Sequence, residues 1–397
     1  MDAQEHTDGA YLDYAAATPV APDVLEAMLP YFTEKFYNPS APYAHARDVK
    51  RALEDARARL AHAIGAKPAN ITLTAGATEA NNLAFASVTG QVITDAIEHE
   101  STLACARARG GTILPVSSEG FVDPEAVREA IGPDTELVSI ALANGEIGTI
   151  QPLRAIAKVV RAERQRRLEA GQMRPLLLHT DATQAAGTLA LAVASLGCDL
   201  MTLSAAKIYG PKQVGLLWAA DGVELSPLIL GGGQEKGLRS GTENVAGAVG
   251  FAVALERAQK EHEQEAKRLR ALRDELQERL LAAIPWAKVS GPARAQQRLA
   301  GLLHISFPGL EARRLVILLD ARGVSVGTGS ACAASKMRIS HVLAAIGAPD
   351  EIAAGSLRIT LGRPTTREQV LYAAHAICEV VESECARLGI HREEQHG

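Results

Sequence analysis

Short apolar runs alternate with amphipathic helical stretches through most of the first 250 residues of this 397-residue chain. The runs are predicted to be short buried strands, at residues 71–74, 92–94, 137–141, 176–179 and 200–203. The stretches with helical periodicity include residues 48–64, 124–131 and 153–170. Alternation of this kind predicts an α/β fold in which a mainly parallel sheet lies between helices. In such sheets, ligands bind at the carboxyl ends of the strands.

A long charged helix is predicted to follow, at about residues 252–283. It should end before Pro285, because the residue before a proline disfavours the helical conformation. Beyond it, an apolar run at 302–307 and a helical pattern at 311–320 indicate a smaller α+β unit. We therefore expect two domains, a large one over residues 15–258 and a small one made of residues 1–14 and 259–397.

Composition excludes several classes of protein. Apolar residues make up 47% and charged residues 22% of the chain, which is typical of a globular protein. A net charge of −5 argues against nucleic acid or an anionic membrane as the main partner. The chain shows no signal peptide and no apolar run of about 20 residues, which a membrane helix needs. We therefore expect a cytoplasmic location.

The five cysteines are an odd number, and none belongs to a Cys-x-x-Cys pair. This usage favours free thiols in a reducing compartment over a disulfide framework or a zinc site, so no metal is expected. At least one of the five is a candidate reactive thiol.

An acid and an amine follow two of the predicted strands. The run Leu176-Leu-Leu-His-Thr leads directly into Asp181, and Lys207 follows the strand at 200–203. A pyridine-aldehyde cofactor needs both groups, since the lysine binds its aldehyde and the aspartate keeps its ring nitrogen protonated. Alone, each residue would more simply be a surface lysine or a helix-capping aspartate. Together they predict a pyridoxal 5'-phosphate site.

A phosphate also needs donors. The strand at 71–74 leads into Gly76 and the start of a helix, where free N–H groups, the helix dipole and the Thr78 hydroxyl would face an anion. On its own such a turn is more often a simple helix cap. A second glycine-rich stretch, 231–242, lacks the Lys-[Ser/Thr] ending of a nucleotide-binding loop.

With these features in place, the chain resembles the cysteine desulfurases of the NifS/IscS type, within the class V aminotransferase family. The resemblance runs from about residue 11 to about residue 380, in the order and spacing of the family. Its motifs are Tyr11-Leu-Asp-Tyr-Ala-Ala-Ala-Thr-Pro, Asn38-Pro-Ser, Thr74-Ala-Gly-Ala-Thr-Glu, Glu98-His99, Asn144-Gly-Glu-Ile-Gly, His179-Thr-Asp-Ala-Thr-Gln, Lys207-Ile-Tyr-Gly-Pro-Lys, Arg239-Ser-Gly-Thr and Gly329-Ser-Ala-Cys. The set is specific, although several of its members would mean little singly.

The resemblance implies a fold-type I architecture, with a seven-stranded-type sheet in the large domain, and a homodimer. It implies that Lys207, Cys332 and His99 are catalytic, with His99 stacked on the cofactor ring. It also implies contacts from Asp181, Gln184 and Asn144 to the ring, from Ala77, Thr78 and Ser204 to the phosphate, from Thr242 to the phosphate of the other subunit, and from Arg358, Asn38 and Asn144 to the substrate. Arginine suits the substrate carboxylate because its planar fork bonds both oxygens.

Cys332 lies in a glycine-rich stretch with small neighbours, which predicts a loop with an accessible sulfur. A thiol must be deprotonated and accessible to attack a sulfur atom. The resemblance implies that Cys332 takes sulfur from L-cysteine as a persulfide, releases L-alanine, and passes the sulfur to a protein acceptor for iron–sulfur cluster, thio-cofactor or tRNA biosynthesis. The other four cysteines are expected in helices or strands, as inert thiols.

Three departures from the family pattern stand out. Ala206 replaces the histidine that commonly precedes the lysine and helps to hold the phosphate. Gly145 occupies the second position of the usual Asn-Asn-Glu, and Ala-Ala-Ser follows Cys332 where Thr-Ser-Ala is frequent. The alternatives left open are a selenocysteine lyase, a class V aminotransferase, and a sulfur-relay scaffold that has lost its cofactor. Cys332 argues against an aminotransferase, which needs no such thiol.

Overall fold

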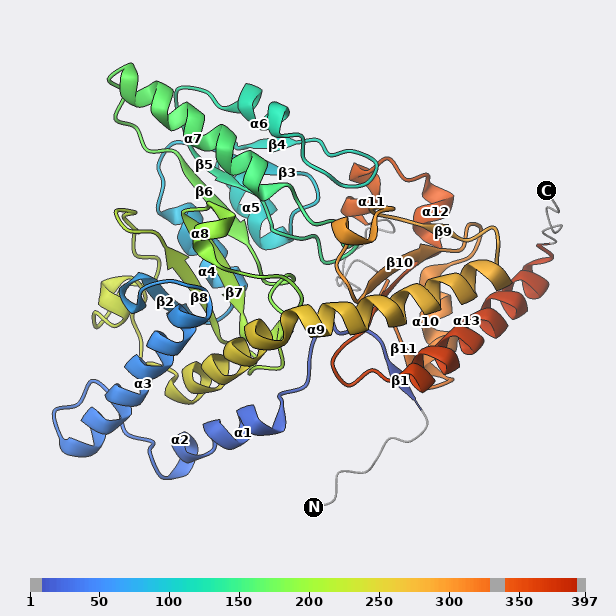
Figure 1. Ribbon diagram of the computed structural model, residues 1–397, viewed down its shortest axis with the longest axis horizontal. Coiled ribbons are helices and arrows are strands. Elements are labelled where there is room, and N and C mark those ends of the chain that lie inside the picture. Colours follow the sequence, from blue (N-terminus) through green and yellow to red (C-terminus); the bar gives the residue numbers. More distant parts are fainter. Residues whose placement is uncertain (1–8, 329–339, 391–397) are drawn as a thin grey trace.

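The computed structural model describes residues 9–328 and 340–390. Its larger half is built on a seven-stranded sheet (Figure 1). In spatial order the strands are β2 (Ile71–Thr74), β8 (Gly215–Ala219), β7 (Leu200–Ser204), β6 (Leu177–Asp181), β5 (Thr135–Ser139), β3 (Gln91–Asp95) and β4 (Thr112–Leu114). All neighbours are parallel except β8, which is antiparallel to both β2 and β7. The predicted α/β class and mainly parallel sheet are therefore confirmed.

Alternate residues of the central strands face two different layers of helices. On one face, Val92, Leu137 and Leu217 pack with α4 (Ala77–Ala86) and α5 (Glu100–Ala108). On the other face, strand residues such as Ile93 and Val138 pack against a larger set of helices. This second layer contains α1 (Pro22–Met28), α3 (Ala44–Ala63), α6 (Pro124–Ala130), α7 (Leu153–Glu169) and α8 (Val193–Leu196). The sheet is thus covered on both sides, as a buried parallel sheet must be.

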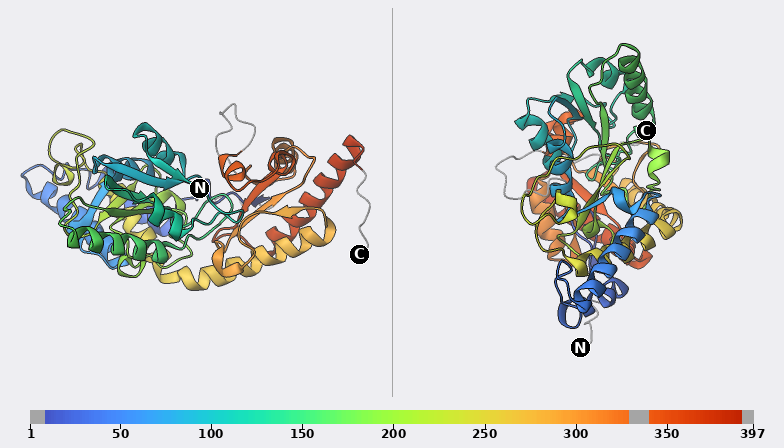
Figure 2. Two further views of the ribbon diagram at one scale, coloured as in Figure 1. Left: turned by 90° about the horizontal axis from the view of Figure 1, so that it is seen from above. Right: turned by 90° about the vertical axis from the view of Figure 1, so that its left-hand side faces the viewer.

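The predicted long helix is one continuous helix, α9 (Val245–Ala283), which begins seven residues earlier than expected. Its first turns are buried almost all round, so they carry no helical periodicity that the sequence pattern could reveal. Its later turns bury only one side, with Leu269, Leu276 and Leu280. Figures 1 and 2 show α9 running along both halves of the molecule. The proposed domain boundary at residue 258 would lie inside this helix.

The smaller half contains an antiparallel sheet in the order β12 (Ser356–Thr360), β10 (Leu302–Ser306) and β9 (Lys288–Val289). A parallel pair, β1 (Ala10–Tyr11) with β11 (Val324–Ser325), brings the N-terminal segment into the same half. Its helices are α10 (Ala312–Asp320), α11 (His341–Ala345), α12 (Asp350–Ala354) and α13 (Arg367–Leu388). The short elements α2 (Pro30–Thr33), η1 (Pro68–Asn70), η2 (Ala205–Lys207), η3 (Glu235–Gly237) and η4 (Ala295–Gln297) complete the fold.

Within residues 9–328 and 340–390, no helix is both long enough and apolar enough to cross a bilayer.

Candidate active site

Asp181 and Lys207 lie at the same edge of the seven-stranded sheet. Asp181 is the last residue of β6, and Lys207 ends the short helix η2 that directly follows β7. The two strands are parallel neighbours, with Asp181 opposite Thr202. Both side chains therefore emerge where the carboxyl ends of the strands meet, which is where ligands bind in α/β sheets.

The Lys207 amine has an environment that favours its neutral form. Its Nζ atom donates a hydrogen bond of 2.6 Å to the carbonyl oxygen of Ala16. Burial, and next the positive charge of Arg358, lower the pKa of the Lys207 ammonium, against the opposing charges of Asp13 and Asp181. A lowered pKa leaves more of the neutral amine at a given pH, and the neutral amine is the form that attacks an aldehyde.

Both carboxylate oxygens of Asp181 accept a hydrogen bond. The side-chain amide of Asn81 donates to Oδ2 at 2.9 Å, and the backbone N–H of Thr183 donates to Oδ1 at the same distance. These donors hold the carboxylate in one orientation at the end of β6. Asp181 is half-buried, so its carboxylate is partly shielded from water and still accessible to a ligand.

His99 caps the N-terminus of α5. Its Nδ1 atom accepts the backbone N–H of Ser101 at 3.1 Å and lies 2.8 Å from the Ser101 hydroxyl oxygen. Because Nδ1 accepts, the neutral ring carries its hydrogen on Nε2, an assignment that rests on the hydrogen-bond network. The residue is exposed, which leaves the imidazole accessible at the edge of the sheet.

The turn at Gly76 forms a cradle for an anion. Gly76 has φ 139° and ψ −179°, a conformation open essentially to glycine alone, and α4 begins immediately after it with Ala77 and Thr78. Gly215 pairs with Ser204 across β8 and β7, and a Cβ atom on Gly215 would lie 2.7 Å from the Gly76 Cα atom. The glycines therefore let the turn pack beside the end of β7. The N–H groups of this helix start suit a phosphate.

Gly145, a departure from the family pattern, has a physical explanation here. A Cβ atom at this position would lie 2.8 Å from the Cγ and Cδ atoms of Gln184. The side chain of Gln184 lies over the glycine and donates from Nε2 to the carbonyl oxygen of Ala15 at 3.2 Å. The small residue therefore accommodates the glutamine.

Asn144 is occupied largely by its own loop. Its Oδ1 atom accepts the backbone N–H groups of Glu146 and Ile147, both at 2.9 Å, and its Nδ2 atom donates to the Ile97 carbonyl oxygen at 2.8 Å. These bonds tie the connection after β5 to the connection after β3. A role of Asn144 toward a cofactor or a substrate stays a prediction.

Arg358, on β12 of the smaller half, reaches the same edge. Its guanidinium donates from Nη2 to Asp13 Oδ1 at 2.8 Å and from Nη1 to the Gly145 carbonyl oxygen at 3.3 Å. The residue is only 6% exposed. After burial, the positive charge of Arg358 is the next cause that lowers the pKa of Lys207. The structure thus brings Arg358, Asp181 and Lys207 together.

Other predicted residues are placed differently. Thr242 is exposed shortly before α9, and Asn38 is exposed between α2 and α3, where its Oδ1 atom accepts the Ser40 N–H at 2.9 Å. Cys332 lies outside the described residues. Of the other cysteines, Cys198 is an exception to the expected placement in helices or strands, since it is buried in the connection between α8 and β7.

The described chain on either side of residues 329–339 is anchored at this edge. Gly327 forms a two-way backbone pair with Arg358, at 3.0 and 2.8 Å. The His341 Nε2 atom forms a 3.0 Å hydrogen bond with the carbonyl oxygen of Glu98, the residue before His99. Both flanks of the stretch that contains Cys332 therefore begin beside candidate site residues.

Sequence reasoning assigned no role to several residues that the structure places here. Asn81, Ser101 and Asp13 contact predicted site residues directly. Two buried carboxyls, Asp95 and Glu98, precede His99 in the chain. Burial raises the pKa of Asp95 to about 7, and burial together with the charge of Asp95 raises the pKa of Glu98. The available signal was polarity: each is a polar side chain on an otherwise apolar helix face or strand end.

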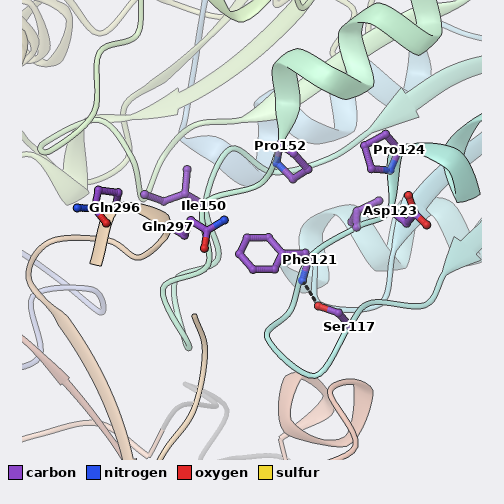
Figure 3. A pocket seen from close by; sticks show the side chains of 9 residues that line it. Ser117, Phe121, Asp123, Pro124, Ile150, Pro152, Gln296 and Gln297 are labelled. Atoms are coloured by element: carbon purple, nitrogen blue, oxygen red, sulfur yellow. Dashed lines mark hydrogen bonds between the residues drawn. The ribbon is translucent and has the colours of Figure 1, made fainter. Parts of the chain in front are cut away.

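Two cavities differ in their chemistry. A hollow of about 550 Å³ (Figure 3) has mainly apolar walls, and the carboxylate of Asp123 in its lining is engaged in capping α6. A smaller cavity of about 90 Å³ is lined by Lys207, Gln184 and Tyr14, at the junction of the two halves. The smaller cavity is therefore the one lined by the Lys207 side chain, and the lining of the larger hollow contains no candidate catalytic group.

The model of the aminotransferase class-V family matches residues 10–372, which is most of the chain.

The chain belongs to this family.

Its relatives within the class-V family include cysteine desulfurases. It is 41% identical, over 384 residues and 94% of both chains, to the cysteine desulfurase IscS of Dictyoglomus turgidum. A solved NifS-like protein superposes with a TM-score of 0.85 at 34% identity, covering 94% of this chain and all of that one. The structure of SspA in complex with cysteine gives a TM-score of 0.74 at 33% identity, covering 89% and 98% of the two chains. The expected family and fold type are confirmed.

Class-V aminotransferases of this branch depend on pyridoxal 5'-phosphate, and the residues present fit that group. Lys207 offers an amine of lowered pKa, Asp181 offers an oriented carboxylate, and the Gly76 turn offers unpaired helix N–H groups. Among the described residues, no three His, Cys, Asp or Glu side chains lie close enough together to hold a metal ion.

Proposed function

We propose that this chain is a pyridoxal-phosphate-dependent cysteine desulfurase that converts L-cysteine to L-alanine and receives the sulfur on Cys332 as a persulfide. The observation that carries the proposal is the pairing of Lys207, an amine of lowered pKa, with Asp181 at adjoining strand ends. The identity of 41% to a cysteine desulfurase over 94% of the chain supports this reaction among those that the family catalyses.

Each residue near this edge has a task in that reaction. Lys207 binds the cofactor and then takes the α-proton of the substrate, which a neutral amine can do. Asp181 would keep a proton on the ring nitrogen of the cofactor, and Arg358, beside Asp13, would receive the substrate carboxylate. When bound, the cofactor stores the electron pair released at the substrate α-carbon. His99 moves a proton through Nε2, because its Nδ1 atom is occupied.

The sulfur transfer follows from thiol chemistry. The Cys332 thiolate attacks the substrate sulfur, so an S–S bond forms while the bond between that sulfur and the substrate β-carbon breaks. The electron pair of the broken bond stays with the substrate carbon, which takes up protons and leaves as alanine. The anchoring of Gly327 to Arg358 and of His341 to Glu98 supports a delivery of Cys332 to this edge.

The proposal includes a homodimer in which Thr242 reaches the cofactor phosphate of the other subunit. The exposure of Thr242 at the end of the glycine-rich stretch supports this arrangement. The stretch itself is held in place by ion pairs of Glu235 with Arg57 and of Arg239 with Glu79. We also propose a protein sulfur acceptor, either an iron–sulfur scaffold or a sulfur carrier, and a cytoplasmic location.

The test compares the wild-type protein with Cys332→Ser in the presence of L-cysteine and a reductant, by measuring alanine and sulfide. Both proteins should hold similar amounts of cofactor, while sulfide production collapses in the variant. Cys378→Ser, in α13, is the matched control and should retain full activity. Unchanged sulfide output from Cys332→Ser would remove this cysteine from the mechanism.

Three further measurements separate the alternatives. An aminotransferase would form pyruvate from alanine and a keto acid, and a selenocysteine lyase would act on L-selenocysteine in preference to L-cysteine. A scaffold without cofactor would stay colourless after reconstitution. We expect a yellow protein whose near-visible band disappears on borohydride treatment.

A further inference from the structure

Asn81 is a fully buried asparagine on α4 whose amide nitrogen contacts two site residues at once. The Nδ2 atom lies 2.9 Å from the Ser101 hydroxyl oxygen and 2.9 Å from Asp181 Oδ2. A primary amide carries two N–H hydrogens, and each of these two contacts uses one of them. The amide therefore acts as a double donor between α5 and the end of β6.

The first contact sets which atom donates in each hydrogen bond that leads to His99. Since Asn81 donates to the Ser101 oxygen, the hydroxyl hydrogen of Ser101 is available for His99 Nδ1, 2.8 Å away. The backbone N–H of Ser101 points to the same nitrogen at 3.1 Å. Two donors at Nδ1 hold the neutral imidazole in its Nε2–H form and in one ring orientation.

The second contact acts on Asp181. The carboxylate receives Asn81 on Oδ2 and the Thr183 N–H on Oδ1, so its rotation about the side-chain bond is restricted from both sides. Asn81 thus bonds both Asp181 and Ser101, the residue that orients His99. Asn81 and Asp181 are 100 positions apart in the sequence.

The acceptor side of the amide points to the same conclusion. Within the described residues, the Asn81 Oδ1 atom is buried and has no hydrogen-bond partner. Leaving a buried polar atom unpaired costs free energy, and the two hydrogen bonds from the Asn81 Nδ2 atom offset that cost. The two donor contacts are the structural reason for an asparagine here.

We propose that Asn81 is a positioning residue of the active site, which fixes the Nε2–H form of His99 through Ser101 and the orientation of Asp181 directly. The inference rests on the proposed function, because His99 and Asp181 act on a cofactor only within it. An aspartate could not replace Asn81, since a carboxylate lacks the two donors and would repel Asp181.

The experiment compares full-length, cofactor-loaded Asn81→Ala and Ser101→Ala with the wild type. Asn82→Ala is the matched control, because Asn82 is the next residue of α4 and its side-chain amide donates to the Thr78 carbonyl oxygen of its own helix. In substrate-free protein, ¹⁵N resonances of the His99 ring report its tautomer, with His99→Gln used for assignment. The pH midpoint of the near-visible band reports the surroundings of the cofactor.

Asn81→Ala should shift the His99 ¹⁵N resonances toward a tautomer mixture and move the midpoint of the band by about half a pH unit. Its kcat for alanine formation should fall by about tenfold, with KM for L-cysteine within about twofold. Ser101→Ala should alter the His99 resonances and leave the midpoint of the band close to wild type. Asn82→Ala should match the wild type in every measurement.

Wild-type His99 resonances together with a wild-type midpoint in folded Asn81→Ala would overturn the proposal. If Asn81→Ala does not fold, the test rests on Ser101→Ala. Unchanged His99 resonances in Ser101→Ala would show that the hydrogen bonds from Asn81 through Ser101 do not set the His99 tautomer, and would overturn the proposal. The His99 resonances are measured without substrate and test the positioning role of Asn81, whereas turnover of L-cysteine by the wild type tests the proposed function. A failure of the positioning role can therefore be told apart from a failure of the proposed function.

Discussion

Arg358 and Asp13 form an ion pair of 2.8 Å between residues 345 positions apart in the chain. Arg358 comes from β12, and Asp13 comes from the N-terminal segment that follows β1. The same guanidinium reaches across to the Gly145 carbonyl oxygen of the larger half. Three separate parts of the chain therefore meet at Arg358, the proposed carboxylate-binding residue. Their contacts hold its planar guanidinium group in one orientation.

Arg358→Lys should raise KM for L-cysteine by at least about tenfold, because an ammonium cannot bond both carboxylate oxygens in the geometry of a guanidinium. L-Cysteinamide, which lacks the carboxylate, serves as the control substrate, and its KM should hardly change. Initial rates of sulfide release measure both. Equal losses on the two substrates would show that Arg358 serves only the fold.

Gly215→Ala should weaken cofactor binding. Its Cβ atom would lie 2.7 Å from the Gly76 Cα atom, so the cradle turn would have to move at an overpacking cost of about 1–3 kcal/mol. We expect a cofactor dissociation constant about tenfold above wild type, measured by absorbance titration. Gly187→Ala is the control, because the nearest atom to its added Cβ is 3.9 Å away. Similar dissociation constants for the two variants would contradict this role of Gly215.

Glu235→Gln should destabilise the protein. The Glu235 carboxylate forms two bonds of 2.7 Å with Arg57, and the two side chains are only 4% and 6% exposed. Without the charge of Glu235, the buried Arg57 guanidinium would keep its ion pair with Glu54, whose side chain is 54% exposed, and would lose its buried partner. We expect a cost of up to about 3 kcal/mol. Urea unfolding at fixed cofactor concentration measures it.

The exposed pair of Lys67 and Asp221 provides the comparison for Glu235→Gln. Asp221→Asn should leave the unfolding midpoint unchanged, because solvent screens that pair. Glu235 and Lys236 also adopt positive φ angles of 48° and 58°, which the ion pair helps to maintain. A Glu235→Gln protein as stable as Asp221→Asn would refute the stabilising role of the buried pair.

His304→Leu should make the protein less sensitive to acid. Burial, and then the charge of Arg358, lower the pKa of His304 from 6.5 to about 3, and neither ring nitrogen has a hydrogen-bond partner in the described chain. Between pH 6.5 and 3 the unfolded chain therefore binds a proton that the folded chain does not, so stability falls as the pH falls. The wild type should lose about 1.4 kcal/mol more than the variant between pH 7.5 and 5.5.

Urea unfolding at both pH values measures this difference for His304→Leu. The exposed His375 is the control position, and His375→Gln should keep the pH dependence of the wild type. Parallel stability curves for the wild type and His304→Leu would exclude His304 as the source of the acid sensitivity.

Features that depend on neighbouring residues could be predicted from the sequence. The apolar runs that end in Asp181 and precede Lys207 predicted two strand ends carrying an acid and an amine, and β6 and β7 have that form. Features with no local signature were missed. The early start of α9 was absent from the prediction because its first turns are buried almost all round and show no helical periodicity. The antiparallel β8 between β2 and β7 was also absent from it, and its place in the sheet depends on partners that are distant in the chain.

The sequence alone thus determined the α/β class, the family and the types of residue in the candidate site. These features depend on the spacing of apolar residues and on the order of the motifs, which are local properties of the chain. Only the tertiary structure decided which side chains support that site. The contacts of Asn81 with Asp181 and of Asp13 with Arg358 join residues 100 and 345 positions apart. Such pairs arise from the order of the strands and the packing of the two halves, which no single segment specifies.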